Sequence, residues 1–361
     1  MKLQTEQSKK IAAVLAATLI LFTALICLFS SGCKYSVNYN YVEYEEGGGY
    51  YIVNTSGYTT SIKGELVIPS TYGEGEKQAP VKEIAEEAFR GSGITKLVIP
   101  ATITKIGAAA FANCTMLEEV VFEEGSALEE IPQGMFGFDE SLTKITLPNS
   151  VKSIGYRAFL DCKNLAEVIL PENLKTITGG AFEECYALSR ITLPEGLESI
   201  GSLAFYYCAL TEIVIPDSVH DTQITVTDSE GNAHTQTVFG LGYGAFHTCM
   251  ALKKAVVGRG ITNIRAGVFG YCNSLEEIYI PSSVIKIEGM YKNGNDIISG
   301  HAFHNCTSLT TVYYAGTKEE WAKIEIDNAG YNNDGVNYNN NALFEEYNEE
   351  LDIVYNKSYK N

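Results

Sequence analysis

The chain has 361 residues, an apolar content of 45% and a formal net charge of −18. An acidic surface of this strength repels the phosphates of nucleic acids and of anionic lipids, which argues against both as direct partners. The apolar content suffices for a folded core.

Residues 1–32 are expected to be a targeting segment that takes no part in the fold. Two lysines precede an apolar run over residues 11–29, and a small residue then stands before Cys33. This order resembles the signal of bacterial lipoproteins, in which cleavage leaves Cys33 to carry the lipid, although Ser30 stands where that signal usually has leucine. An uncleaved membrane anchor is the alternative, because about 18 or more apolar residues can span a bilayer. In both cases this segment is the only membrane contact, and the rest of the chain lies outside the cytoplasm.

Residues 33–60 are expected to form a tether that leads into an N-terminal cap, with a short strand from Tyr50 to Val53. A cap is needed because the first unit of a stacked array would otherwise expose its apolar core. The capped array begins at about Ile62.

A unit of about 23 residues recurs over residues 61–314, and its clearest copies open at Leu142, Leu165 and Leu188. A repeat of this length is one supersecondary unit, which buries its apolar face only against neighbouring copies. We therefore predict one elongated solenoid rather than the two or three domains that the length alone suggests. The expected fold class is a mostly β, right-handed superhelix of about ten coils, with a parallel sheet on one face and short helical turns.

Each copy has three parts. The first reads Leu-x-x-Ile-x-Ile-Pro, as in Leu210 to Pro216, and its alternating apolar positions predict a short strand that the proline ends. The second reads Val-x-x-Ile, as in Val151 to Ile154, and predicts another brief extended segment. The third reads Ala-Phe-x-x-Cys and is expected to be one helical turn, whose phenylalanine stacks on its neighbours as a core spine.

Seven cysteines stand three residues after a repeat phenylalanine, namely Cys114, Cys162, Cys185, Cys208, Cys249, Cys272 and Cys306. Equivalent positions of stacked coils form one column, and free cysteine packs as a small apolar residue. The spacing lacks the compact pattern of a metal site, and an odd number argues against a disulfide framework. We therefore predict a buried column of free thiols and no cofactor.

Charges alternate in sign at the position before the first strand isoleucine. In a parallel, in-register sheet these side chains form one row on the exposed face, where opposite neighbours fix the register. This charge row consists of Glu65, Lys96, Glu119, Lys144, Glu167, Arg190, Glu212, Lys254 and Glu277.

A mostly apolar row is expected two residues further along, on the same face. Its members are Val67, Val98, Val121, Thr146, Ile169, Thr192, Val214, Val256, Tyr279 and Tyr313. Such a row exceeds the apolar area that a monomer usually exposes, and its aromatic end suits a binding anchor. The candidate ligand-binding residues are therefore Tyr279, Tyr313, Ile169, Val214 and Val256, with Lys144, Arg190 and Lys254 for orientation.

Three copies carry insertions. Residues 70–79 form a loop near the N-terminal end, residues 220–238 read as a hairpin with a polar turn, and residues 288–296 read as a loop rich in glycine and asparagine. The last two leave the coil at the same place, two coils or about 10 Å apart. They are expected to rise from one side of the solenoid and to contribute selectivity to binding.

All five histidines lie in or beside these coils. With a carboxylate such as Asp228, two or three imidazoles could hold zinc, but the spacing contains no tight metal motif. We expect no metal, and the weak candidates are His220, His247, His301 and His304. Motifs for nucleophilic, phosphate-binding or metal-dependent catalysis are absent from the sequence, so no catalytic residue is expected.

Residues 315–361 are expected to form a C-terminal cap and tail. A short amphipathic helix should place Trp321 over the final coil, because the last strand is not followed by another Ala-Phe-x-x-Cys segment. Leu351 to Tyr355 is expected to add one more strand.

The pattern Leu-x-x-Ile-x-Ile-Pro-x-x-Val-x-x-Ile-Gly-x-x-Ala-Phe-x-x-Cys-x-x, with the cap-like Tyr314 to Trp321, resembles the BspA-type leucine-rich-repeat family. The resemblance implies a leucine-rich-repeat solenoid on the surface of a host-associated bacterium, with adhesion or ligand binding as its activity and an extracellular protein or glycan as partner. It transfers no catalytic residues. The competing interpretations are a structural scaffold of a bacterial envelope assembly and, from the histidines, a metal-dependent enzyme.

Overall fold

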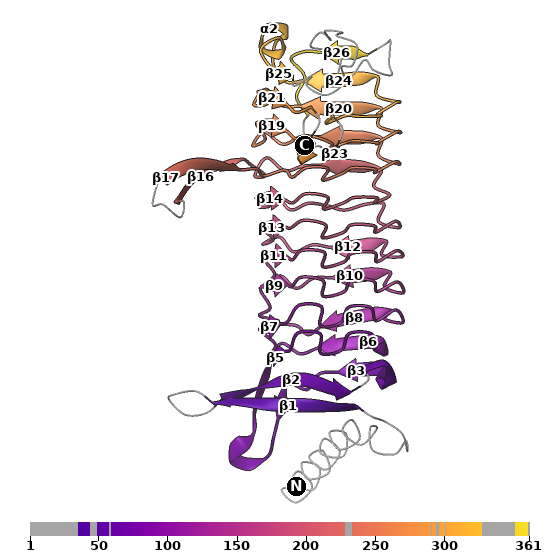
Figure 1. The fold of residues 1–361 in the computed structure, drawn as a ribbon, viewed down its shortest axis with the longest axis vertical. Helices are drawn as coiled ribbons and strands as arrows, with labels where there is room; N and C mark the ends of the chain where they lie inside the picture. The colour runs from indigo at the N-terminus through magenta and orange to yellow at the C-terminus, as the bar shows by residue number, and fades with distance from the viewer. Residues whose placement is uncertain are drawn as a thin grey trace, which may run out of the picture.

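The computed structural model describes residues 35–43, 49–57, 59–227, 233–289, 291–293, 296–299, 301–326 and 351–359. Its coils stack along one long axis (Figure 1). One end carries the hairpin of β1 (Tyr35–Glu43) and β2 (Gly49–Gly57), and the other carries β26 (Asp352–Val354) and α2 (Lys318–Trp321). The predicted targeting segment and Cys33 lie outside the described residues. Within the described part of the chain, the structure contains no helix whose length and hydropathy would suit a membrane span.

Two ladders of parallel strands run along the solenoid and form two columns in Figure 1. The first ladder, which we call the sheet face, consists of β3 (Lys63–Val67), β6 (Gly93–Ile99), β8 (Glu119–Phe122), β10 (Lys144–Thr146), β12 (Glu167–Ile169), β15 (Glu212–Val214), β18 (Lys254–Val256), β20 (Glu277–Ile280), β24 (Thr311–Tyr314) and β26 (Asp352–Val354). The second ladder consists of β5 (Ala79–Ile84), β7 (Lys105–Ile106), β9 (Glu130–Ile131), β11 (Ser153–Ile154), β13 (Thr176–Ile177), β14 (Ser199–Ile200), β19 (Asn263–Ile264), β21 (Lys286–Ile287) and β25 (Glu325–Ile326). The predicted solenoid with in-register parallel strands is confirmed.

The sheet face is interrupted twice, contrary to the expected continuous row of strands. Strands pair within three groups, β3-β6-β8, β10-β12 and β15-β18-β20-β24-β26. Residues 188–194 form no strand, and Ile191 is only half-buried although the equivalent Ile145 and Ile213 are each 1% exposed. This coil is one residue short, since a single residue separates Cys208 from Leu210, so its strand does not reach register with β15.

The Ala-Phe-x-x-Cys segments form tight turns rather than the expected helical turn. Backbone N–H groups alternate in direction: that of Phe159 donates to the carbonyl of Ala181 in the next coil at 2.8 Å, whereas that of Leu160 donates to Arg157 in its own coil at 3.2 Å. Residues two before and two after the phenylalanine are left-handed, as at Arg157 (φ 53°) and Asp161 (φ 56°). An α-helix needs negative φ throughout, so these residues prevent one from forming.

The phenylalanines stack as predicted, from Phe89 to Phe303. Centroids of neighbouring rings lie between 5.2 and 6.1 Å apart in nearly parallel pairs. The rings therefore form a continuous spine, in the offset geometry that aromatic pairs favour.

The seven repeat cysteines are free and buried, as predicted. Each thiol donates to the carbonyl of the phenylalanine in the preceding coil, with Sγ–O distances between 3.0 and 3.3 Å. Burial raises the pKa of Cys114, Cys249 and Cys306 to about 12. The thiols therefore stay protonated and act in packing, because a nucleophile or metal ligand must be a thiolate.

Asp139 occupies the cysteine position of its coil, and the sequence pattern gave no warning of it. Its side chain is fully buried at 0% exposure. One oxygen, Oδ1, accepts a hydrogen bond from the N–H of Cys114 at 2.8 Å, while Oδ2 has no partner among the described residues. Burial raises the pKa of this carboxyl well above its usual range and so favours its protonated form.

Separate elements close the two ends of the solenoid. At the N-terminal end, β1 (Tyr35–Glu43) and β2 (Gly49–Gly57) form an antiparallel hairpin, and β2 pairs with β5. The first insertion contains β4 (Thr71–Tyr72) and the 3-10 helix η2 (Gly75–Lys77), and another 3-10 helix, η1 (Thr59–Ser61), precedes β3. At the C-terminal end, α2 (Lys318–Trp321) begins with a capping box between Thr317 and Glu320. Trp321 is 4% exposed and packs edge-on against Tyr314 at 5.1 Å.

Candidate functional site

The charge row lies on the sheet face, and its members neutralise one another. Lys96 contacts both Glu65 (3.7 Å) and Glu119 (3.3 Å), and Lys254 contacts Glu277 at 3.1 Å. A bridge of 2.7 Å joins Lys144 to Glu167. Exposed pairs of this kind contribute at most about 1 kcal/mol each, so the row orders the coils more than it stabilises them.

Arg190 is the one candidate of the charge row whose coil contributes no strand to the sheet face. Its side chain is exposed, and no ion pair joins it to another described residue of the row. The structure therefore brings Lys254 toward the aromatic candidates but leaves Lys144 and Arg190 on earlier coils.

The apolar row is not uniformly exposed. Val67 and Ile169 are 46% and 43% exposed, Val214 is half-buried, and Val256 is only 6% exposed. The two tyrosines at its end are half-buried, and Tyr359 packs edge-on against Tyr279 at 5.2 Å.

Tyr279, Tyr313, Tyr359 and Lys254 form what we call the tyrosine–lysine cluster. The rings of Tyr279 and Tyr313, on β20 and β24, stack at 4.4 Å. Tyr359 meets Tyr279 edge-on at 5.2 Å. The Lys254 ammonium lies 5.2 Å from the ring centroid of Tyr279 and 5.1 Å from that of Tyr359. Burial opposes the charge of Lys254, but the hydrogen bond and charge of Glu277 outweigh it and raise the pKa of the ammonium. The cluster therefore offers flat aromatic area beside a fixed positive charge.

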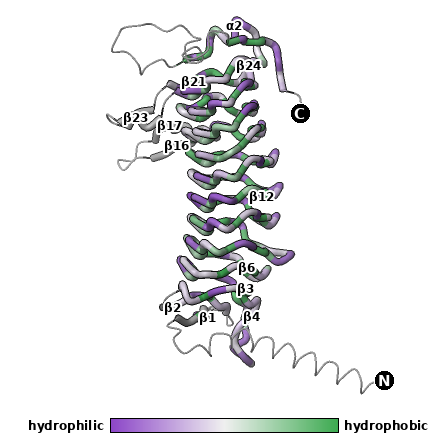
Figure 2. Tube along the Cα trace, turned by 90° about the vertical axis from the view of Figure 1, so that its right-hand side faces the viewer, coloured by the Kyte–Doolittle hydropathy of each residue, from purple (hydrophilic) through white to green (hydrophobic). Residues whose placement is uncertain are grey.

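Tyr359 reaches the cluster because the chain turns back after β26. The N–H groups of Asn356 and Lys357 donate to the carbonyls of Gly316 and Tyr314, each at 2.9 Å. Figure 2 shows this segment running back along the solenoid instead of beyond it. Sequence reasoning missed Tyr359, since a single tyrosine outside the repeat carries no periodic signal.

Two hairpins project from the second ladder near the same coils. The predicted hairpin is present and consists of β16 (Thr222–Thr227) and β17 (Ala233–Val238). It projects away from the solenoid in Figure 1. The later insertion, expected to be a loop, also contains an antiparallel pair, β22 (Tyr291–Asn293) and β23 (Asp296–Ser299). Asp228 lies outside the described residues, as does the side chain of His234.

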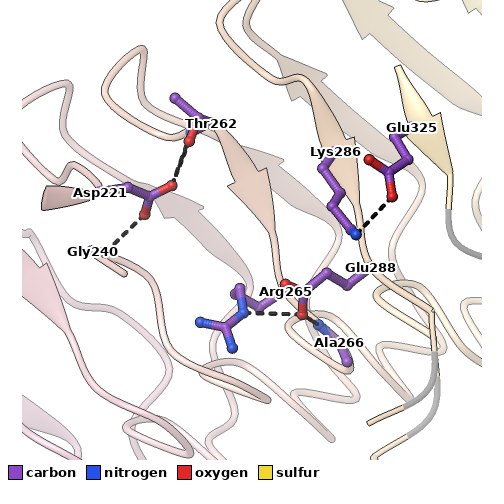
Figure 3. Close-up of polar contacts among 8 residues, drawn as sticks. All are labelled: Asp221, Gly240, Thr262, Arg265, Ala266, Lys286, Glu288 and Glu325. Atoms are coloured by element: carbon purple, nitrogen blue, oxygen red, sulfur yellow. Dashed lines mark hydrogen bonds and ion pairs between the residues drawn. The ribbon is translucent and has the colours of Figure 1, made fainter. Parts of the chain in front are cut away.

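Arg265 joins the bases of the two hairpins. Its guanidinium lies between the rings of Phe239 and Tyr243, with its central carbon 3.5 and 3.6 Å from their centroids. The Nε donates to Glu288 at 3.0 Å, and the same carboxylate accepts from the N–H of Ala266 (Figure 3). Because the side chain is only 7% exposed, this contact fixes the residues after the first hairpin to those before the second.

Asp221 closes the base of the first hairpin from its other side. One carboxylate oxygen accepts from the N–H of Gly240 at 2.9 Å, and the other accepts from the hydroxyl of Thr262 at 2.6 Å (Figure 3). The residues on either side of the hairpin are thereby tied to each other and to the next coil.

Part of the repeat region matches a family model. Residues 125–226 match the family model for the BspA type leucine rich repeat region, in 6 copies. The coils over these residues are of the BspA leucine-rich-repeat type.

Solved leucine-rich-repeat structures are similar to this chain at low identity. A leucine rich cell surface protein from Faecalibacterium prausnitzii is 23% identical, over 84% of this chain and 100% of its own, with a TM-score of 0.29. A leucine-rich repeat protein from Bacteroides ovatus is 19% identical, over 91% and 100%, with a TM-score of 0.34. The pneumococcal vaccine antigen PcpA is 19% identical, over 81% and 96%, with a TM-score of 0.34. The comparison with curated proteins found no match.

The histidines of the solenoid do not converge. His220 is exposed and its Nδ1 lies 2.6 Å from the carbonyl of Ser218. His247 and His304 are separated by the ring of Tyr271, whose centroid lies 5.2 and 5.0 Å from theirs. His301 and His304 are 6.4 Å apart between ring centroids. Among the described residues, no group of three or more possible ligands could hold a metal ion.

A row of rings along the turns of the repeats was not anticipated from the sequence. Consecutive centroids are 6.0, 4.6, 5.5, 5.2 and 5.0 Å apart. We call this the turn-face row, and it consists of Tyr186, Tyr207, Tyr206, His247, Tyr271 and His304. The available signal was an aromatic residue directly after the repeat phenylalanine or one position later, in four successive coils.

Proposed function

We propose that the protein is a cell-surface binding protein, which contacts an extracellular protein or glycan through the sheet face and the two hairpins. The observation that carries this proposal is the tyrosine–lysine cluster, in which Tyr279 and Tyr313 present a stacked pair beside Lys254. Tyrosine anchors dominate binding energies because they contribute large area at low entropic cost. The two hairpins rise near the same coils and would supply selectivity.

Two further points support this proposal. The similar structures include one described as a cell surface protein and one described as a vaccine antigen. A solenoid also presents a long open surface without a catalytic cleft, which suits binding rather than chemistry. A location outside the cytoplasm follows from the apolar segment over residues 11–29, which would anchor the chain as a signal with lipid on Cys33 or as an uncleaved span.

The test is binding of residues 34–361, which contain every described element, to immobilised extracellular matrix proteins and to glycan arrays. We expect saturable binding that falls at least 10-fold in the double variant Tyr279→Ala/Tyr313→Ala, because each interface anchor contributes about 1–2 kcal/mol or more. Tyr156→Ala, which removes an exposed ring elsewhere (47% exposed), serves as the matched control and should bind as the parent does.

The alternative is a scaffold that binds another protein of the same bacterial envelope. In that case the arrays would give no signal, and cross-linking in cells would join the chain to an envelope protein through the same cluster. An unchanged affinity of the double variant for its partner would exclude the cluster as the site.

A further inference from the structure

The turn-face row is a second surface that suits a ligand, on a different side of the coils from the tyrosine–lysine cluster. Its rings come from five successive coils and follow the same straight axis as the phenylalanine spine beneath them. Tyr186 and Tyr271 are 44% and 38% exposed, and the other rings are half-buried.

The rings of the row are tilted against one another, with interplanar angles between 45° and 76°, and a glycine makes room for one of them. A Cβ atom at Gly270 would stand 2.8 Å from Cδ2 of His247, a distance that real Cβ atoms do not reach. Glycine at position 270 therefore allows the imidazole of one coil to lie against the backbone of the next. The left-handed conformation of Tyr207 (φ 59°) and Tyr271 (φ 58°) belongs to the repeat and directs both side chains outward from the turn.

The exposed turn positions of this stretch carry no lysine or arginine, and an acidic side chain, Glu184, accepts a hydrogen bond from the Tyr186 hydroxyl at 3.0 Å. Burial, with the nearby His304, lowers the pKa of His247 to about 4, so that imidazole is uncharged. Burial and the hydrogen bond to Glu184 raise the pKa of Tyr186 to about 12. Lysine and arginine do not occur at the exposed turn positions of these five coils, while the whole chain carries −18. An anionic ligand therefore finds no counter-charge here and meets an unfavourable field.

The size of the row excludes a globular protein as its partner. Five coils spaced by about 4.8 Å make a strip roughly 19 Å long and one ring wide. A stable protein–protein interface needs about 800 Å² from each partner, several times more than such a strip supplies. A narrow strip fits a linear chain lying along it.

Backbone geometry separates a peptide chain from a glycan chain. A bound extended peptide needs free N–H and carbonyl groups at a sheet edge. Here the N–H of Tyr207 donates to His247 (3.2 Å), that of Thr248 to Gly270 (2.7 Å) and that of Tyr271 to His304 (2.6 Å). The turns therefore satisfy their own backbone groups. The row presents aromatic rings and tyrosine hydroxyls to a ligand, which suit the C–H faces and hydroxyls of sugar rings.

We propose that the turn-face row binds a neutral glycan chain, whose sugar rings stack on the tyrosine and histidine rings of successive coils. This proposal rests on the proposed role in surface binding but places a ligand on a different face. It commits to an uncharged polysaccharide, since neither acidic polymers nor proteins suit the charge and the width of the strip.

The experiment measures binding of the chain to neutral polysaccharides (β-glucan, mannan and galactan) by affinity electrophoresis, with polygalacturonate as the acidic probe. We expect retardation by at least one neutral polymer, and at least 10-fold weaker affinity in Tyr206→Ala/Tyr271→Ala. Tyr206→Phe/Tyr271→Phe keeps the rings and should retain affinity within about threefold. That variant also guards against a folding artefact, because it preserves the packing; thermal melts of all variants check the fold.

Tyr279→Ala/Tyr313→Ala separates this proposal from the proposed function. If that variant keeps polysaccharide binding while the turn-face variant loses it, the turn-face site is supported whatever happens at the sheet face. The proposal is wrong if no neutral polymer binds, if only polygalacturonate binds, or if Tyr206→Ala/Tyr271→Ala binds as tightly as the parent. It is also wrong if only the sheet-face variant loses binding.

Discussion

Asp139 shows how a single position can act against the repeat that contains it. Its eight neighbours in the column are seven cysteines and Ser92, all of which are neutral at physiological pH. A buried carboxyl must either stay protonated or ionise in an apolar core, and both cost free energy as the pH rises. The residue is tolerated because its Oδ1 accepts from the Cys114 N–H at 2.8 Å.

We expect Asp139→Cys to stabilise the protein, by an amount that grows with pH. The folded-state pKa of Asp139 is raised above its ordinary value of 3.8, so between these two values the folded state binds more protons than the unfolded state. Stability therefore falls as pH rises through this interval, and the substitution removes that loss. The gain should be close to zero at pH 3.5 and about 1–3 kcal/mol at pH 7, measured by urea unfolding at each pH.

Two controls accompany this comparison. Asp139→Asn keeps the oxygen acceptor and removes the charge, so it should show the same pH trend. Cys162→Asp makes the reverse change in the next coil and should introduce a loss that grows with pH. A gain from Asp139→Cys that is equal at pH 3.5 and pH 7 would show that packing, and not ionisation, is responsible.

The sequence predicts the cysteine column but not its exception, for a physical reason. Period and residue type place Cys162 and its equivalents in the core, because neighbouring coils repeat the same environment. Asp139 breaks the pattern at one coil, and sequence alone does not tell whether an acid at that position turns outward or stays in. The structure keeps it in, since the turn geometry leaves the third residue after Phe136 no other direction.

At the scale of elements, the ladders could be predicted and the contacts between insertions could not. Alternating apolar positions around Ile145 and Ile213 predict those strands correctly. The same pattern around Ile191 forms no strand, because that coil is one residue short. The Arg265 guanidinium lies between the rings of Phe239 and Tyr243. This contact joins residues outside the repeat positions, so no periodic signal predicts it. The return of Tyr359 to Tyr279 was missed for the same reason.

We expect Arg265→Ala to loosen the bases of both hairpins together. The substitution removes the guanidinium from between two rings and leaves the half-buried Glu288 without its cation, at a cost of about 2–4 kcal/mol. Hydrogen exchange should become faster over residues 239–243 and 286–289, while β10 and β12 stay protected. Arg265→Lys should recover only part of the effect, because an ammonium lacks the planar group that stacks.

Arg259→Ala is the matched control for Arg265→Ala. Arg259 also pairs with an aspartate, Asp217, but its side chain is 81% exposed. The same change of charge should therefore shift stability by less than about 0.5 kcal/mol and leave exchange at the hairpin bases unchanged. If both variants change stability and hydrogen exchange alike, the loss of a positive charge explains the result, and the contact of Arg265 with Phe239, Tyr243 and Glu288 does not.

At the scale of the whole molecule, the charge row makes the order of coils matter. Stability of a solenoid is approximately a sum of coil and interface terms, so whole coils can be removed. Deleting residues 165–187 would place Lys144 beside Arg190, two like charges. Deleting residues 165–209 would place Lys144 beside Glu212 and keep the alternation. The sequence alone supplies this argument, because register and period together fix which side chains become neighbours.

We expect the one-coil deletion to lower the free energy of unfolding by more than half of the loss that the two-coil deletion causes. The excess should be a few tenths to about 1 kcal/mol, because only the one-coil deletion places two like charges side by side. The excess should vanish in 1 M NaCl, where screening acts within about 3 Å. Arg190→Thr provides the decisive comparison, since its effect should depend on context. In the parent Arg190 is exposed and forms no ion pair with another described residue of the row, so the substitution should change stability by less than about 0.5 kcal/mol. In the one-coil deletion it relieves repulsion from Lys144 and should stabilise. Urea unfolding of the parent and the one-coil deletion, each with and without Arg190→Thr, at low and high salt measures both effects, and an equal effect in both contexts would mean that the row does not govern coil order.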